Sequence, residues 1–417
     1  MSAAAACCCL LLILATTTAS SLHGQQTDGG CFTTERDALL SFKAGIAEDP
    51  QSILASWNGQ DCCLWSGVRC SNRTGQVIGL DLRNDFPFAD FFDFSWNYGK
   101  RHGIHGKISP SMLALHHLEY LDLNGNYLGG IGVSIPRFLG SLESLVYLNL
   151  SWMNFVGKVP PQLGNLSRLL YLDLYNKWNP GGELFAGDIS WLARLPSLKF
   201  LDMSGVNLRT TGNWVQVLNM LSNLRALRLE DCRLVFPQIS VVHSNLTSLQ
   251  MLDLSNNWLH TLNPTYWFWD VGTIRHLDLS GNEIDEPFPD AMGNMTCLEA
   301  LHLGYNHLTI VKSKALKNLC NLRMLTLEEN WINQYLSEFL EGLPHCVWSK
   351  MELLDLSMTN LSGEIPKWIN KWTDLRIVKL SSNRLVGSVP LEIGPLSKLK
   401  ILYLDSNQFN GSILEDH

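Results

Sequence analysis

Four cysteines that could do chemistry gather early in the chain, three of them in the stretch DCCLWSGVRC: they are Cys31, Cys62, Cys63 and Cys70. Clustered thiols could bind a metal ion, exchange electrons or form structural disulfides. A zinc site needs a C-x-x-C spacing or a nearby pair of histidines, and this segment offers neither. The compartment decides between the other two, because disulfides persist in oxidising surroundings.

The N-terminus indicates an oxidising compartment. An apolar run at residues 3–15, followed by small polar residues, is typical of a secretory signal peptide, which we expect to cover residues 1–24. No later stretch reaches the roughly 20 apolar residues that cross a bilayer. We therefore expect a secreted chain or the outer part of a longer, anchored one. The clustered cysteines then predict disulfides within an N-terminal cap at residues 25–74.

Composition and motifs argue against several function classes. The net charge is −8, and lysine and arginine form no block, which argues against nucleic acid as a partner. The histidines are dispersed, and the H-E-x-x-H, G-x-S-x-G and P-loop motifs are all missing. We therefore expect a protein that is not an enzyme and needs neither a metal nor a cofactor.

The strongest signal is a repeat. From residue 75 onward the pattern L-x-x-L-x-L-x-x-N-x-L recurs in thirteen units, most clearly in LEYLDLNGNYL (118–128) and LQMLDLSNNWL (249–259). This pattern is typical of a leucine-rich-repeat solenoid. The alternation x-L-x-L-x turns the leucines inward and the intervening residues toward solvent, so each unit adds one strand to a parallel sheet. We expect an α/β solenoid with this sheet on its concave face.

The asparagine of the repeat pattern can both donate to and accept from backbone groups in the turn after each strand. Asparagine holds seven of the thirteen positions, and the others carry His102, Met153, Lys177, Val206, Cys232 and Thr359. Most of these exceptions fall in residues 150–235, where the spacing of the units is also irregular. We expect local distortion there and a regular arc over residues 250–332.

The first unit carries an insertion at residues 85–101. It is rich in aromatic residues, among them Phe91, Phe92, Phe94, Trp96 and Tyr98. A loop this apolar has to fold back on the solenoid or meet a partner, and both readings stay open. The array runs to residue 417, where the last unit is incomplete and has no cysteine cap.

The stretch CFTTERDALLSFKAGI and the segments LSGEIP (361–366) and LVGSVP (385–390) carry a family resemblance. They resemble the N-terminal cap and the repeats of plant extracellular leucine-rich-repeat proteins. The segment NLCNL (318–322) and the insertion resemble receptor-like proteins of the disease-resistance kind, of which this chain would be a truncated form. The resemblance implies the bridges Cys31–Cys62, Cys63–Cys70 and Cys320–Cys346. Cys232 and Cys297 stay outside these bridges, with a Cys297–Cys320 bridge as the alternative.

The same resemblance implies a function. It points to the ligand-recognition ectodomain of a receptor-like protein in immune or developmental signalling, at the outer face of the plasma membrane or in the cell wall. The ligand would be an extracellular peptide, protein or glycan, and membrane receptor kinases would be partners of the full-length protein. The alternative is a secreted inhibitor of microbial cell-wall hydrolases, similar to polygalacturonase-inhibiting proteins, although the insertion points away from it.

Candidate ligand-binding residues are those that face the concave side and differ from the usual aspartate of the repeat. They are Tyr171, Tyr175, Arg228, Glu230, His302, Thr326, Glu328 and Lys379. We rank Tyr171, Tyr175 and Arg228 first, because aromatic and arginine side chains most often dominate binding energy. In an exported chain the N-x-S/T sequons predict glycans. The sequons lie at Asn72, Asn149, Asn165, Asn245, Asn294, Asn360 and Asn410.

Overall fold

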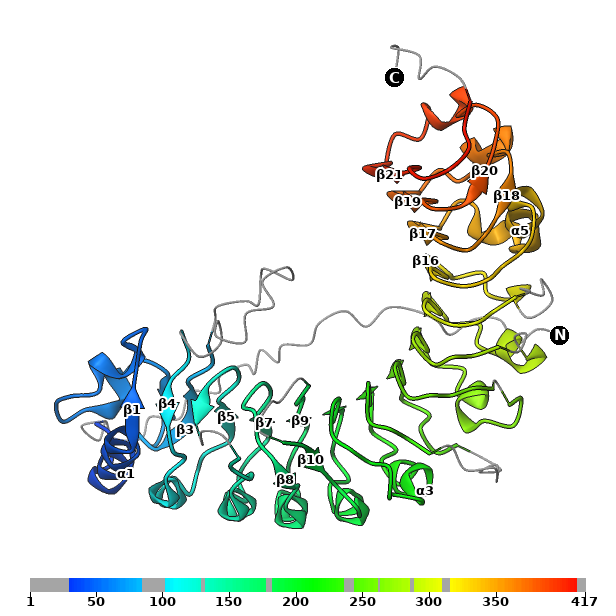
Figure 1. The fold of residues 1–417 in the computed structure, drawn as a ribbon. Helices are drawn as coiled ribbons and strands as arrows, with labels where there is room; N and C mark the ends of the chain where they lie inside the picture. The colour runs from blue at the N-terminus through cyan, green and yellow to red at the C-terminus, as the bar shows by residue number, and fades with distance from the viewer. Residues whose placement is uncertain are drawn as a thin grey trace.

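The computed structural model describes residues 30–84, 102–128, 132–177, 182–235, 244–261, 263–285, 289–309 and 316–410. These residues form a curved solenoid whose strands line the inner side of the arc and whose helical turns lie along the outer side (Figure 1). The expected signal peptide at 1–24, the insertion at 85–101 with its candidate aromatic contacts, and the last residues, 411–417, all lie outside the described residues.

One sheet runs the length of the described array and contains fourteen strands. All neighbours pair in parallel except the first two, which are antiparallel. In order, the strands are β2 (Val68–Cys70), β3 (Val77–Asp81), β5 (Tyr120–Asp122), β7 (Tyr147–Asn149), β9 (Tyr171–Asp173), β11 (Phe200–Asp202), β12 (Ala226–Arg228), β13 (Met251–Asp253), β14 (His276–Asp278), β15 (Ala300–His302), β16 (Met324–Thr326), β17 (Leu353–Asp355), β19 (Ile377–Lys379) and β21 (Ile401–Tyr403).

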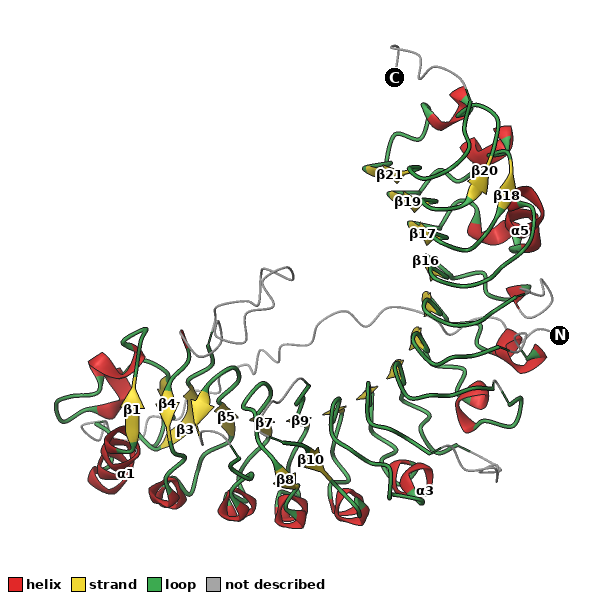
Figure 2. Ribbon diagram, in the orientation of Figure 1, coloured by secondary structure: helices red, strands yellow, loops and turns green. Residues whose placement is uncertain are grey.

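The outer side is built from short helices joined by loops, and each unit contains little regular structure beyond its strand (Figure 2). The α-helices are α1 (Thr33–Ala44), α3 (Trp214–Leu218) and α5 (Leu336–Gly342). The 3-10 helices are η1 (Ile53–Ser56), η2 (Cys62–Leu64), η3 (Pro110–Ala114), η4 (Arg137–Ser141), η5 (Pro161–Asn165), η6 (Ser190–Arg194), η7 (Trp267–Asp270), η8 (Asp290–Asn294), η9 (His345–Val347), η10 (Lys367–Lys371) and η11 (Leu391–Ile393). Among the described residues, none of these helices has the length and apolar composition needed to cross a bilayer.

Three small sheets support the main one. They are formed by β1 (Ile46–Glu48), β4 (His105–Gly106) and β6 (Tyr127–Leu128), by β8 (Gly157–Lys158) and β10 (Leu184–Phe185), and by β18 (Ser362–Gly363) and β20 (Arg384–Leu385). Because β1 belongs to the N-terminal cap and pairs with β4 of the first unit, this sheet joins the cap to the array.

The leucines of the repeat form the core, as their alternation predicts. The middle residue of each strand stacks on its neighbour in register, for example Leu148 on Leu172 and Leu172 on Leu201. All three are fully buried. Complete burial of a leucine side chain contributes about 1.5–3 kcal/mol. Since each unit buries its core only against its neighbours, stability accumulates along the array.

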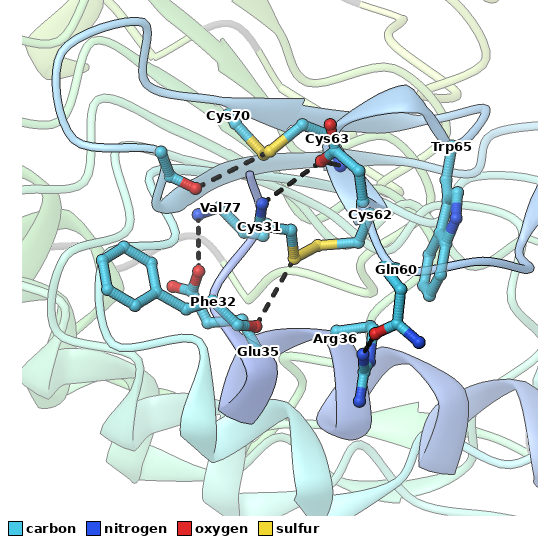
Figure 3. The surroundings of a disulfide bond; sticks show 12 residues. Cys31, Phe32, Glu35, Arg36, Gln60, Cys62, Cys63, Trp65, Cys70 and Val77 are labelled. Atoms are coloured by element: carbon cyan, nitrogen blue, oxygen red, sulfur yellow. Dashed lines mark hydrogen bonds between the residues drawn. A yellow bond between two sulfur atoms is a disulfide. The ribbon is translucent and has the colours of Figure 1, made fainter. Parts of the chain in front are cut away.

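The cap covers the first unit and is fastened by two disulfides, Cys31–Cys62 and Cys63–Cys70, as the resemblance implies (Figure 3). Two features join it to the array. The carboxylate of Glu35 accepts a hydrogen bond of 3.0 Å from the backbone nitrogen of Val77, at the start of β3. Phe42 is fully buried in the core that the cap shares with the first units.

Asparagine side chains form a ladder behind the strands of the regular region. The Nδ2 of Asn282 donates to the carbonyl oxygens of Leu254 and Leu279, both at 3.0 Å. Its Oδ1 accepts from the backbone nitrogens of Asn257 at 2.9 Å and Leu259 at 3.1 Å. The amide thus satisfies buried backbone groups of two neighbouring units. Asn257, Asn306 and Asn330 repeat parts of this arrangement.

The irregular region departs from the ladder without breaking the sheet. Strands β7, β9, β11, β12 and β13 pair in continuous register, so the distortion expected over residues 150–235 is absent from the strands themselves. Cys232 replaces an asparagine, and its thiol donates to the carbonyl of Met203 at 3.1 Å. In the fourth unit Asn176, and not Lys177, turns inward and donates to Phe155 at 2.9 Å, because burying a lysine ammonium would be costly.

Candidate ligand-binding face

A column of stacked aromatic rings covers part of the first half of the concave face. Tyr120, Tyr147, Tyr171 and Phe200 occupy the same position in four consecutive strands. Successive ring centroids are 4.3, 4.2 and 4.2 Å apart, and the planes are nearly parallel. The strand spacing of the sheet brings the rings to stacking distance, so the column follows from the repeat of one residue type at one position.

Arginines lie at both ends of this column. The guanidinium of Arg69, from the cap, lies 5.3 Å from the ring centroid of Tyr120. At the other end the guanidinium of Arg228 lies 5.7 Å from the centroid of Phe200. The stack stops there because the next strand presents Ala226, whose methyl group cannot continue it. Both arginines are within the range of favourable cation–π contacts.

Carboxylates beside the column bind the tyrosine hydroxyls. The hydroxyl of Tyr147 donates to Asp122 Oδ2 at 3.1 Å, and that of Tyr171 donates to Asp173 Oδ2 at 3.3 Å. Burial raises the pKa of Asp122. Burial, followed by the nearby charge of Asp202, raises the pKa of Asp173 to about 7. The polar groups around the column therefore satisfy one another.

The candidate residue Tyr171 lies inside this column. Tyr147 covers one face of its ring and Phe200 covers the other, while its hydroxyl binds Asp173. Only the edge of the ring remains for a ligand. Tyr171 therefore contributes to the structure of the sheet first, which the sequence pattern, with no view of the neighbouring rings, did not indicate.

A hollow opens on the concave face immediately beyond the column. It holds about 650 Å³ of space open to solvent. Its lining comes from six consecutive units: Tyr175, Asp202, Ser204, Arg228, Glu230, Met251, Leu252, Asp253, His276, Leu277, Asp278 and His302. Four of the eight candidate residues, Tyr175, Arg228, Glu230 and His302, therefore come together in one place.

Contacts at the near wall of the hollow fix its side chains. The ring of Tyr175 packs against Trp152 with centroids 4.5 Å apart. Arg228 lies 3.7 Å from Asp202 Oδ2, and Glu230 Oε1 is 2.5 Å from the ammonium of Lys177. The two basic side chains at this wall are thus already paired with carboxylates.

The remaining candidates lie beyond the hollow, farther along the sheet. Thr326 Oγ1 is 3.2 Å from His302 Nδ1, and Lys379 Nζ is 3.0 Å from Asp355 Oδ2. Burial raises the pKa of Glu328, whose buried Oε2 has no hydrogen-bond partner among the described residues. The structure does not bring these three into the hollow.

Eight of the twelve lining residues were missing from the candidates predicted by sequence, and four of these eight have ionisable side chains. Asp202, Asp253 and Asp278 were set aside as repeat consensus, and His276 was not singled out at all. The signal for His276 was present, because it occupies the strand position that carries Tyr171 in the fourth unit. The aspartates could not be told apart by sequence, since their partners come from other units.

The sequons differ in accessibility. The exposed ones are Asn72, Asn165, Asn245, Asn294 and Asn410, whereas Asn360 is half-buried. Asn149 lies in β7 on the concave face and is only 5% exposed, with its Nδ2 3.4 Å from Asp122 Oδ2. Because a glycan would be attached to that nitrogen, we do not expect one at Asn149, and the exposed sequons remain predictions.

The cysteine sulfurs offer no metal site among the described residues. Those of Cys31, Cys62 and Cys63 lie within 4.8 Å of one another, a spacing that could suit an ion. All three are consumed by the two cap disulfides, so none can supply a thiolate. The third bridge, Cys320–Cys346, joins two neighbouring units, and Cys232 and Cys297 stay outside the three bridges.

Family models match several parts of the chain. The Leucine rich repeat N-terminal domain matches residues 33–71, which contain α1 and the adjacent cysteines. The Leucine rich repeat model matches residues 222–284, and a second repeat model matches residues 117–142 and 144–166. The matched segments contain Tyr120 and Tyr147 of the aromatic column and eight of the twelve residues that line the hollow.

Two solved structures resemble the fold. A leucine-rich-repeat protein of Leptospira interrogans aligns with a TM-score of 0.56 and 23% identity, covering 73% of this chain and 70% of that one. A TDR receptor aligns with a TM-score of 0.53 and 21% identity, covering 74% and 55%. At this level of identity the likeness shows the fold, a leucine-rich-repeat solenoid.

Sequence relatives are more specific. The Receptor-like protein EIX1 of Solanum lycopersicum is 37% identical over 284 residues, which are 66% of this chain and 26% of that protein. The Receptor-like protein EIX2 of the same plant is 34% identical over 340 residues, which are 80% of this chain and 32% of that protein. The matched region thus spans about a quarter to a third of these relatives. The chain is a leucine-rich-repeat protein with an N-terminal domain of that family, and over much of its length it is homologous to plant receptor-like proteins.

Proposed function

We propose that the chain is the ligand-recognition part of an extracellular plant receptor-like protein, and that its concave sheet is the binding face. The observation that carries this proposal is the hollow beyond the aromatic column, where side chains from six units converge on one solvent-filled space. Ligand sites are typically concave and combine apolar surface with a few polar groups, as this lining does.

Three further observations support an extracellular role. The cap is closed by disulfides, which persist in oxidising compartments. The relatives reported above are receptor-like proteins, which favours a receptor over the hydrolase-inhibitor alternative. None of the exposed sequon asparagines is among the residues that line the hollow. We propose a peptide or protein ligand, and delivery to the cell surface or cell wall through an N-terminal signal peptide.

Binding measurements with matched surface variants would test the proposal. The glycosylated chain is immobilised, and fractionated extracellular fluid from microbe-treated plant tissue is passed over it. In one variant, Arg228, Glu230 and His302 on the concave face are replaced by alanine. In the control, the exposed outer residues Arg137, Lys158 and Lys367 are replaced instead.

The proposal expects saturable binding that the concave variant loses and the outer-face control keeps. Binding that survives the concave changes, or that only the outer-face changes abolish, would contradict the assignment of the binding face. Both variants should remain folded, because none of the six changed side chains belongs to the leucine core.

A further inference from the structure

Aspartates form a column along the concave face, two residues after the aromatic position in each strand. The Oδ1 atom of each aspartate accepts a hydrogen bond from a backbone nitrogen. The partner of the Oδ2 atom differs from unit to unit. Oδ2 meets a hydroxyl or a basic group at five of them: Asp81 with Arg83, Asp122 with Tyr147, Asp173 with Tyr171, Asp202 with Arg228, and Asp355 with Lys379. At these five positions, Oδ2 therefore already has a hydrogen-bond or ion-pair partner within the protein.

Asp253 and Asp278 differ from the other five. Each Oδ1 accepts from the backbone nitrogen and the hydroxyl of the serine two residues later, Ser255 or Ser280. Neither Oδ2 has a hydrogen-bond or ion-pair partner among the described residues. Both aspartates line the hollow, and they are paired in adjacent strands.

The surroundings of Asp253 and Asp278 favour a positive charge. Asp253 and Asp278 are direct partners in adjacent strands, and like charges placed opposite one another in a sheet repel. Burial, with the charge of Asp278 next, raises the pKa of Asp253 to about 6. The basic side chains at the near wall of the hollow are already paired, Arg228 with Asp202 and Lys177 with Glu230. A positive charge from outside would relieve this repulsion.

The rest of the lining suits a flexible apolar stem. Met251 and His276 precede the two aspartates in their strands and are also direct partners in the sheet. The side chains of Met251 and His276 give the hollow apolar surface beside its carboxylates. Lysine and arginine side chains combine these features, because a methylene chain packs on apolar surface while its charged end reaches polar groups.

We propose that the hollow binds a lysine or arginine side chain of the ligand, with the cationic end between Asp253 and Asp278 and the stem against Met251 and His276. This inference rests on the proposed recognition function and names the type of ligand side chain that one subsite binds. A ligand carboxylate would be repelled here, since four of the lining side chains are carboxylates. A divalent metal ion is the competing occupant, and the experiment separates the two.

The probe is Nα-acetyl-lysine methylamide, compared with Nα-acetyl-norleucine methylamide, which has the same stem and lacks the charge. Both are titrated into the full chain carrying labelled methionine methyl groups, and the methyl resonance of Met251 is followed. A third titration uses calcium alone. The test variant carries Asp253→Asn and Asp278→Asn, and the control carries Asp355→Asn, at the same strand position but paired with Lys379.

Both variants should fold, because the chain already contains the substitution. Asn149 occupies the aspartate position in β7, and its Oδ1 accepts from the backbone nitrogen of Ser151 at 3.0 Å. The asparagines keep that bond and remove only the charge. Unchanged chemical shifts of methionines distant from the hollow, such as Met112, would verify the fold.

We expect the lysine probe to shift the Met251 resonance at millimolar concentration and to bind at least about tenfold more tightly than the norleucine probe, a difference of roughly 1.4 kcal/mol. The double variant should lose this preference, and Asp355→Asn should keep it. Equal binding of both probes, preference surviving in the double variant, or a shift produced by calcium alone would overturn the proposal. Since no natural ligand is used, such a failure would leave the recognition function to its own test.

Discussion

Two parts of the same sheet hold neighbouring units together by different means. In β5 to β11 the concave side is closed by the aromatic column, while the turns behind β7 and β11 carry Met153 and Val206 in place of asparagine. In β13 to β16 the turns carry asparagine throughout, and the concave side opens into the hollow. The two devices act on opposite sides of the strands.

This comparison suggests a division of labour. Where the amide ladder is complete, asparagine amides already connect neighbouring units behind the strands, and the concave face carries carboxylates and open space. Where the ladder is interrupted, the stacked rings add contacts between units on the concave side. Arg228 lies at the boundary, since it contacts Phe200 of the column and lines the hollow.

The largest expected effect is loss of one ladder amide. Asn282→Ala removes an amide that donates to and accepts from buried backbone groups of two neighbouring units. At about 1–3 kcal/mol for each group left unsatisfied, the local cost should reach roughly 3 kcal/mol or more. Hydrogen exchange of β13 and β14 would measure it.

A matched control for the ladder is Asn223→Ala. This asparagine is exposed, and its side chain donates one hydrogen bond, to the carbonyl oxygen of Pro196 at 2.9 Å. Its removal should change the free energy of local opening, measured by hydrogen exchange, by less than about 1 kcal/mol. Equal effects of the two substitutions would show that the ladder contributes no more than a surface amide.

Next in size is a break in the aromatic column. Tyr147→Ala removes two stacked pairs and the hydroxyl bond to Asp122, with an expected local cost of about 2 kcal/mol. Met251→Ala, at the same strand position beside the hollow, has no stacked partner and should cost less. Hydrogen exchange of β7 and β13 compares the two regions directly. A larger loss of stability from Met251→Ala than from Tyr147→Ala would contradict the claim that the aromatic column stabilises its units from the concave side.

The column region should also respond to pH. Burial and Asp202 raise the pKa of Asp173 in the folded chain to about 7, whereas an unfolded aspartate titrates near 4. This carboxyl is influenced by Asp202 in the neighbouring strand, by Arg228 in the strand after that, and by the Tyr171 hydroxyl. The folded state therefore binds protons more readily. The stability that protonation of Asp173 contributes is fully present below pH about 4 and is lost as pH rises through about 7.

Melting temperatures at pH 5 and pH 7.5 would check this dependence. Asp173→Asn cannot ionise, so it should lose less stability over that interval than the parent chain does. Asp355→Asn serves as the comparison, because Lys379 pairs with that carboxylate. An identical pH dependence in the parent chain and in Asp173→Asn would remove Asp173 as its source.

The smallest effects concern binding. Tyr175→Ala should weaken binding of an active extracellular fraction about five- to thirtyfold, or roughly 1–2 kcal/mol, because Tyr175 lines the hollow. Tyr171→Phe keeps the stacked ring and should leave binding within about twofold. A stronger loss at Tyr171 than at Tyr175 would move the binding face onto the column.

Much of the fold could be predicted from the sequence because the repeat encodes it locally. The alternation of leucines placed the strands and their inward faces, and the resemblance of the cap implied Cys31–Cys62 and Cys63–Cys70, which the structure contains. The candidate site was harder, because it depends on contacts between units. Sequence spacing indicates that Tyr171 faces the concave side, but not that Tyr147 and Phe200 cover its ring.

The aspartates illustrate the same limit. Asp253 and Asp355 are identical in the repeat pattern, so both were read as consensus. They differ because the next strand offers Lys379 to Asp355 and a second aspartate, Asp278, to Asp253. Which consensus residue is available to a ligand is therefore decided by its neighbour in space, about 25 residues away in sequence, as the repeat period implies.

The central claim is that the hollow on the concave face is where a ligand binds. Hydroxyl-radical footprinting of the chain with and without an active extracellular fraction tests it most directly. We expect lower oxidation of Tyr175, Met251, His276 and His302 in the presence of the fraction, with Trp331, which is 68% exposed and lies outside the hollow lining, unchanged. Protection of Trp331 or of residues 85–101 with no protection in the hollow would contradict the account.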